Sequence, residues 1–73
     1  MLGVAVFLVE DEALIRLMIA EMLEELGHRV VAEAGSIEAA EPLARTAIFD
    51  LAIFDINVGG TKNLVHAAQP ARI

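Results

Sequence analysis

The sequence predicts an α/β domain built on a small parallel sheet. Apolar runs of strand length alternate with segments of helical periodicity, in the order strand, helix, strand, helix, strand. The first and third runs are apolar at every position, which is typical of strands that helices cover on both faces. A strand–helix–strand unit crosses over with a right hand, so strands joined in this way lie parallel.

The first expected strand spans residues 4–9, a Val-rich run, and the segment after it changes to helical spacing. We expect the apolar residues of this segment to face the sheet. They are Leu14, Ile15, Met18, Ile19, Met22, Leu23 and Leu26. The charged residues expected to face solvent are Arg16, Glu21, Glu24 and Glu25. Asp11 is a suitable N-cap for this helix, and Gly27 a suitable left-handed residue at its end.

The second expected strand is short and covers residues 30–32. Ser36 then offers an N-cap for a second helix over about 37–47. Pro42 falls inside that helix, where it removes a backbone hydrogen bond at a cost of about 3 kcal/mol. We therefore expect the helix to kink at Pro42, or to restart there with Pro42 in its first turn.

The third expected strand covers residues 51–54 and ends at Asp55. No further run suited to a buried strand follows Gly60, and residues 62–69 are compatible with about two helical turns. We therefore divide the chain into a domain over residues 1–60 and an atypical tail over residues 61–73.

The composition excludes several classes of function. The chain has 73 residues, enough for one small domain, and no Cys, so it has neither a disulfide nor a thiolate zinc site. Its net charge is −6, and no basic stripe offers a surface for nucleic acid or an anionic membrane. No apolar stretch is long enough to span a bilayer, and the start lacks the positive region of a signal peptide. We expect a cytoplasmic protein.

Carboxylates stand at the ends of two of the expected strands. Glu10 and Asp11 follow the first strand, and Asp55 ends the third. Ligands of open parallel sheets bind beyond the carboxyl ends of the strands, so we expect these acids to converge. Asn57 is placed to add a carbonyl oxygen from a loop. Oxygen ligands of this kind suit Mg²⁺, and a carboxylate beside that ion can accept a phosphoryl group.

Two segments carry a resemblance to a known family. VFLVEDEALIRLMIAEMLEELGH resembles the first strand, acidic pair and first helix of the receiver domain of two-component response regulators. FDLAIFDINVGG resembles its third strand, its phosphoacceptor Asp and the loop that follows. The resemblance covers about residues 4–60. It implies part of a flavodoxin-like three-layer sandwich with parallel strand order 2-1-3, in which the family's fourth and fifth strands are absent.

The resemblance also implies a role for each residue of the site. Asp55 would be the phosphoacceptor and form an aspartyl phosphate. Asp11 would be a direct Mg²⁺ ligand, Glu10 a ligand acting mainly through water, and Asn57 would contribute its backbone carbonyl. The donor would be a phosphohistidine on a sensor histidine kinase or a histidine phosphotransfer protein.

The chain departs from the family in its second half. Family members end their fourth strand in Ser or Thr and their fifth in Lys, and both side chains contact the phosphoryl group. Thr61 and Lys62 have the right chemistry but follow Asp55 too closely to be assigned these roles. Without the later strands, the third strand would be an exposed apolar edge, which predicts a homodimer or swapped oligomer through that edge.

Three functions remain open on the sequence. The first is a phosphoaccepting signalling module that is not an enzyme. The second is a receiver-derived interaction or dimerisation module that is not phosphorylated, which the missing Ser/Thr and Lys favour. The third is a Mg²⁺-dependent phosphohydrolase with an Asp nucleophile, but that class requires Asp-x-Asp, and this chain has Asn57 in place of the second acid.

Overall fold

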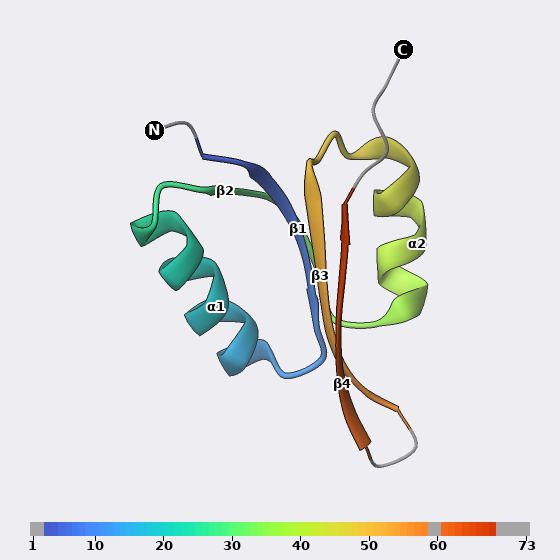
Figure 1. Cartoon of the computed structure of the whole chain (residues 1–73). Coiled ribbons are helices and arrows are strands. Elements are labelled where there is room, and N and C mark those ends of the chain that lie inside the picture. Colours follow the sequence, from blue (N-terminus) through green and yellow to red (C-terminus); the bar gives the residue numbers. More distant parts are fainter. Residues whose placement is uncertain (1–2, 59–60, 69–73) are drawn as a thin grey trace.

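A four-stranded sheet with one helix on each face forms the described part of the chain (Figure 1). The computed structural model describes residues 3–58 and 61–68, and the side chains of residues 3–56. Its elements are β1 (Ala5–Glu10), α1 (Ala13–Glu25), β2 (Arg29–Ala34), α2 (Ile37–Thr46), β3 (Leu51–Val58) and β4 (Thr61–Ala68). The sheet order is β2-β1-β3-β4, and β1 is parallel to both of its neighbours. The predicted parallel order 2-1-3 is confirmed.

The central strand β1 explains the continuous apolar run of the sequence. It has a strand on each side and a helix on each face, so all six of its residues are buried. Phe7 packs against the rings of Phe49 and Phe54, with ring centroids 5.3 and 6.2 Å away. These rings, with Ala40 of α2, belong to a hydrophobic core on the α2 face of the sheet. Burial of this strand is the main source of stability in so short a chain.

Helix α1 ends as predicted but begins differently. Gly27 has φ of +94°, and the N–H of His28 donates to the carbonyl of Leu23 at 3.0 Å, which closes the helix in a Schellman motif. At the other end the N-cap is Glu12, whose side chain makes no capping hydrogen bond. The predicted N-cap, Asp11, is wrong because the helix starts at Ala13 and Asp11 lies one residue too early.

The apolar surface of α1 is mostly exposed, contrary to the prediction. Leu14, Met18, Met22 and Leu26 are each more than half exposed, whereas Ile15, Ile19 and Leu23 are half-buried. Only Ala20 of this helix is buried. A single helix lying on a sheet buries a narrow stripe of its surface, and within the described residues no second helix lies beside α1 to cover the rest.

Helix α2 confirms its predicted range and its cap. The hydroxyl of Ser36 accepts a hydrogen bond from the N–H of Ala39 at 3.1 Å. The helix runs from Ile37 to Thr46 without restarting at Pro42, so that alternative is wrong. Ala40 is buried in the core and Leu43 packs against it, on either side of the proline that removes a helical hydrogen bond.

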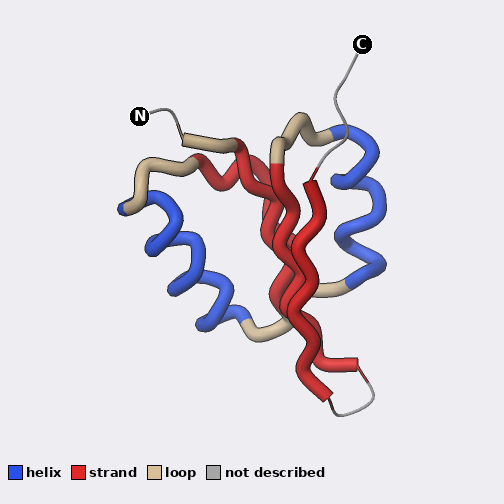
Figure 2. The backbone as a smooth tube through the Cα atoms, viewed as in Figure 1, coloured by secondary structure: helices blue, strands red, loops and turns tan. Residues whose placement is uncertain are grey.

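Strand β4 overturns the prediction for the tail. Thr61–Ala68 is a strand rather than two helical turns, and it pairs antiparallel with all of β3, from Leu51↔Ala68 to Val58↔Thr61 (Figure 2). The outer edge of β3, predicted to be exposed, is therefore covered. An open edge leaves a row of backbone groups unpaired, and the next segment of chain satisfies them locally. Residues 69–73 of the predicted tail lie outside the described part.

The hairpin also changes the extent of β3 and of the sheet. β3 continues to Val58 instead of ending at residue 54, because its last residues pair with β4. The family's parallel fourth and fifth strands are absent from the described residues, and the two outer strands of this sheet are β2 and β4. None of the helices in the described ranges has the length and apolar character needed to cross a membrane.

Candidate functional site

Two carboxylates meet at the carboxyl edge of the parallel strands. Glu10 is the last residue of β1, and Asp55 is its partner in the β1–β3 register. Neighbouring strands lie about 4.8 Å apart, and paired residues face the same side of a sheet. Register therefore brings together two acids that are 45 positions apart in the chain, as the strand-end pattern predicted.

Glu10 is the buried member of this pair. It is 0% exposed, and its Oε2 accepts a hydrogen bond from the N–H of Glu12 at 2.9 Å. The other oxygen, Oε1, is buried as well. Burial of a carboxylate is costly unless hydrogen bonds or opposite charge compensate it. A costly group held at a strand end is a strong candidate for a functional residue.

The three acids differ in their access to solvent. Asp11 is exposed in the turn between β1 and α1, Asp55 is partly buried, and Glu10 is fully buried. The site is thus open on the side of Asp11 and closed on the side of Glu10.

The donor set fits an ion that needs few protein ligands. Among residues 3–58 and 61–68, no group of three His, Cys, Asp or Glu side chains is arranged to enclose a metal. The atoms at this edge are carboxylate and carbonyl oxygens, the hard ligands that Mg²⁺ prefers. Mg²⁺ usually keeps several waters and takes only one or two carboxylates from the protein, so the pair at Glu10 and Asp55 is compatible with it.

Asn57 lies in a strand and not in a loop as predicted. It is two residues beyond Asp55 in β3, and its register partner is Lys62 of β4. The loop expected there is wrong because pairing with β4 extends β3 to Val58. The side chains of Asn57, Thr61 and Lys62 lie outside the described part, so no role for them rests on the structure.

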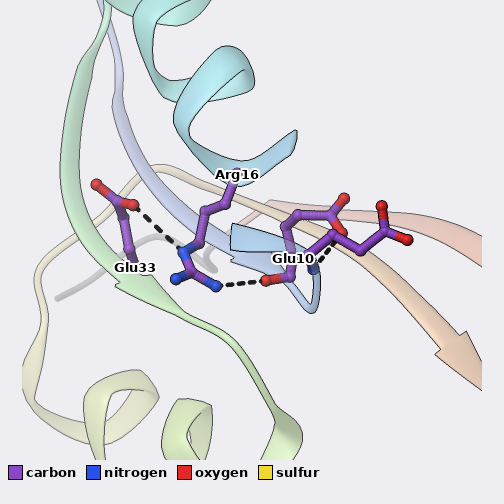
Figure 3. Close-up of polar contacts among 4 residues, drawn as sticks. Glu10, Arg16 and Glu33 are labelled. Atoms are coloured by element: carbon purple, nitrogen blue, oxygen red, sulfur yellow. Dashed lines mark hydrogen bonds and ion pairs between the residues drawn. The ribbon is translucent and has the colours of Figure 1, made fainter. Parts of the chain in front are cut away.

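Arg16 is the residue that sequence reasoning missed. It was expected to be solvated, yet its side chain is only 25% exposed and points back toward the end of β1 (Figure 3). One guanidinium nitrogen donates to the carbonyl of Glu10 at 2.7 Å, and Nε lies 3.6 Å from Oε1 of Glu33. The sequence offered one signal for this contact. Arg16 lies in the first turn of the helix, and long side chains on a helix point toward its N-terminus, which here follows the end of β1.

Polar residues at the opposite edge of the sheet make backbone contacts. Asp50 precedes β3, and its Oδ2 accepts from the N–H of Ala5 at 2.9 Å. The N–H of Asp50 donates in turn to the carbonyl of Ala5 at 2.8 Å. His28 accepts through Nδ1 from the N–H of Val4 at 3.2 Å. These residues align the amino ends of the strands and leave the carboxyl edge as the candidate site.

Two surface depressions lie apart from the acids. One is lined by Ala20, Glu21, Glu24 and Glu25 of α1. The other is an apolar groove between α2 and β3, lined by Ile37, Ala40, Glu41, Ala44 and Phe54. Neither of these two depressions is lined by Glu10 or Asp55.

Comparison with known proteins agrees with this geometry. A family model described as the response regulator receiver domain matches residues 6–65. The chain is 47% identical over 53 residues to the transcriptional regulatory protein PdtaR of Mycobacterium tuberculosis, in strains CDC 1551 / Oshkosh and ATCC 25618 / H37Rv. These matches cover 73% of this chain and 26% of each relative, so the chain spans about a quarter of their length. No solved structure matches the chain.

Proposed function

The chain belongs to the response regulator receiver domain family, and on that premise we propose that Asp55 accepts a phosphoryl group in the presence of Mg²⁺. Membership of this family supports a place in two-component signalling. The observation that carries the finer proposal is the register that pairs Glu10 with Asp55 at the carboxyl edge. Two neighbouring carboxylates repel each other, and a cation bound between them would reduce that repulsion.

Four residues would hold the metal under this proposal. Asp11 and Asp55 would be carboxylate ligands, the backbone carbonyl of Asn57 a third, and Glu10 would act mainly through a bound water. The exposure of Asp11 and the partial burial of Asp55 are compatible with direct ligation, whereas the indirect role of Glu10 rests on the family resemblance. When bound, Mg²⁺ would offset the negative charge of the carboxylates and the transferring group.

The transfer itself needs one nucleophile from this chain. A carboxylate oxygen of Asp55 attacks the phosphorus of a phosphohistidine, a P–O bond forms, and the P–N bond breaks. The electron pair of that bond stays on the imidazole nitrogen, which takes a proton from solvent. Asp55 lies in β3, which pairs with β1 on one side and β4 on the other, so its backbone position is fixed. The chain therefore orients the nucleophile, and the phosphohistidine donor provides the free energy of transfer.

The partner and the setting follow from this chemistry. The donor would be a sensor histidine kinase or a histidine phosphotransfer protein, and transfer would take place in the cytoplasm. The phosphoryl group remains on the chain as a signal, so the module is a switch and not an enzyme. The relative PdtaR is named a transcriptional regulatory protein, and we propose an output of that class only for a longer protein containing this receiver.

The test is phosphorylation of the full chain by acetyl phosphate. With Mg²⁺ present, intact-mass spectrometry should show the gain of one phosphoryl group, and hydroxylamine should remove it because an acyl phosphate is labile to that reagent. Asp55→Asn should abolish the gain. The matched control is Asp50→Asn, just before the same strand, which keeps an oxygen able to accept from Ala5 and should be phosphorylated normally.

Two outcomes would refute the phosphoacceptor role. One is an unchanged mass after incubation of the folded chain with acetyl phosphate and Mg²⁺. The other is an equal gain of mass in Asp55→Asn, which would place the phosphoryl group elsewhere.

One observation favours the second candidate, an interaction module that is not phosphorylated. Helix α1 exposes several large apolar side chains, and such a surface promotes association. They are Leu14, Leu17, Met18, Met22 and Leu26. Sedimentation at micromolar concentration distinguishes the candidates: a dimer indifferent to acetyl phosphate favours this alternative, and a monomer argues against it. The phosphohydrolase gains no support, because position 57 carries no acid.

A further inference from the structure

Arg16 connects three elements beside the acidic turn. It lies in the first turn of α1, and its own N–H donates to the carbonyl of Glu12 at 2.9 Å. Its guanidinium reaches the carbonyl of Glu10 at the end of β1, and it pairs with Glu33 on β2 (Figure 3). One side chain thus holds the helix, the central strand and an outer strand at the edge where the acids lie.

The surroundings of Arg16 are shaped for a guanidinium. Gly35 follows β2, and a Cβ built on it would lie 2.8 Å from one guanidinium nitrogen of Arg16. The absence of a side chain at that position therefore leaves room for the guanidinium. Lysine is a poor substitute. Its single side-chain nitrogen cannot contact the Glu10 carbonyl and the Glu33 carboxylate with the geometry of the planar guanidinium group.

The hydrogen bond to Glu10 fixes the peptide that leads into Asp11. A peptide unit is planar, so the carbonyl of Glu10 and the N–H of Asp11 move together. The carboxylate of Glu10 meanwhile accepts from the N–H of Glu12. The turn is thereby held from both sides, by Arg16 before Asp11 and by the Glu10 side chain after it.

The charge of Arg16 is paired beside the acidic turn. Its guanidinium donates to the backbone carbonyl of Glu10 and lies next to the carboxylate of Glu33, 3.6 Å from Nε to Oε1. Glu33 thus balances the guanidinium charge on the β2 side, while the hydrogen bond to Glu10 orients the turn.

We propose that Arg16 is a positioning residue of this site: by holding the Glu10–Asp11 peptide it sets the direction of the Asp11 carboxylate, and so the affinity for Mg²⁺. The inference rests on the proposed function, since it concerns the metal that Asp55 needs as phosphoacceptor. Gly35 takes part by keeping the space that the guanidinium occupies. Replacing a residue that orients a metal ligand without touching the metal typically weakens metal affinity by about 10- to 100-fold.

The first experiment compares two arginine substitutions in the full chain. Arg16→Met keeps the apolar stem and removes both contacts, whereas Arg45→Met removes the same charge from the last turn of α2, where the side chain is 75% exposed. Titration with MgCl₂ followed by amide chemical shifts should give a dissociation constant about tenfold weaker for Arg16→Met. Arg45→Met should match the wild type.

A second readout separates positioning from a general loss of structure. The rate of phosphorylation by acetyl phosphate should need about tenfold more Mg²⁺ to reach half its maximum in Arg16→Met. At saturating Mg²⁺ the rate should return close to that of the wild type. A merely structural role would instead lower the amplitude at every Mg²⁺ concentration, because a fraction of the chain would be unfolded.

A third set of variants keeps the inference testable if Arg16→Met does not fold. Gly35→Ala retains the arginine but displaces its guanidinium, and should weaken Mg²⁺ binding in the same direction. Glu33→Gln leaves the bond to Glu10 in place and should have a smaller effect. Gly35→Ala added to Arg16→Met should cause no further loss, because residues that act through one contact are not additive.

The outcomes distinguish this inference from the function on which it rests. If the wild type binds Mg²⁺ and is phosphorylated, but Arg16→Met, Gly35→Ala and Arg45→Met all equal it, the positioning role is overturned and the phosphoacceptor role stands. If the wild type itself neither binds Mg²⁺ nor gains a phosphoryl group, both are overturned. Circular dichroism of each variant identifies those that are folded.

Discussion

The two edges of the parallel strands use the same kind of side chain in opposite ways. At the amino edge, the Asp50 carboxylate accepts a backbone hydrogen bond from Ala5, so its negative charge faces a donor. At the carboxyl edge, Glu10 and Asp55 are register partners on neighbouring strands, so two negative charges face the same place. Asp50 and Asp55 are separated by only one short strand segment, yet Asp50 accepts from a backbone N–H and Asp55 lies opposite another carboxylate in the register.

This difference shows where the molecule keeps its stability and where its chemistry lies. A carboxylate that accepts a backbone N–H stabilises the fold. Two carboxylates placed side by side on neighbouring strands repel each other and lower stability unless a cation lies between them. The amino edge therefore holds the register of β1 and β3 through hydrogen bonds, and the carboxyl edge places two acids side by side, where the proposed site lies.

The largest expected effect on folding is at the amino edge. Asp50→Ala removes the acceptor for the N–H of Ala5 and should lower the free energy of unfolding by about 1.5 kcal/mol. Urea denaturation measures this loss. The Mg²⁺ dissociation constant of the folded fraction should not change. A weakened Mg²⁺ affinity in this variant would break the separation between the two edges.

An effect of opposite sign is expected at the carboxyl edge. Glu10→Gln keeps an oxygen that can accept from Glu12 but removes a buried charge beside Asp55. Without Mg²⁺ the variant should be more stable than the wild type by about 1 kcal/mol. Addition of MgCl₂ should stabilise the wild type more than the variant, because a ligand that binds the native state more tightly raises its stability more.

Urea curves with and without MgCl₂ test this reversal directly. If Glu10→Gln were less stable than the wild type in the absence of Mg²⁺, the buried carboxylate would be stabilising the native state, which contradicts the prediction. A matched substitution at a solvated acid, Glu25→Gln on α1, should show neither effect.

The smallest expected effect belongs again to the amino edge. His28→Ala removes the acceptor for the N–H of Val4, a contact of 3.2 Å next to the start of β1. The loss should be about 0.5 kcal/mol, because that backbone group lies near solvent and water can replace the partner. Urea denaturation measures it. A loss larger than that of Asp50→Ala would mean that β1 is aligned mainly by β2 and not by β3.

Features with a local cause were predictable from the sequence. The cap at Ser36 depends on a hydroxyl three residues before the amide it accepts from, and the turn at Gly27 depends on a residue that tolerates positive φ. The approach of Glu10 to Asp55 was also predictable, because the carboxyl ends of parallel strands lie at the same edge of a sheet; the register that pairs them is a finding of the structure.

Features that depend on absent or distant neighbours were not predictable in the same way. Met18 and Met22 have the spacing of core residues, but they are exposed because nothing in the described part lies over that side of α1. Thr61–Ala68 has no strong strand pattern, but it becomes a strand because β3 offers an open edge. The Gly59-Gly60 pair between the two runs was the available hairpin signal.

By itself the sequence determined the order of strands and helices up to β3, the helix ends at Ser36 and Gly27, and the carboxylate of Glu10 at the end of β1. Each of these follows from the conformational preference of a few adjacent residues, or from a hydrophobic period that adjacent residues share. Only the tertiary structure decided that β4 covers β3 and that Arg16 holds the turn before Asp11. Both join segments that are close in the chain, but each depends on the tertiary surroundings: β4 needs the open edge of β3, and the Arg16 side chain needs the end of β1 and Glu33 of β2 beside it.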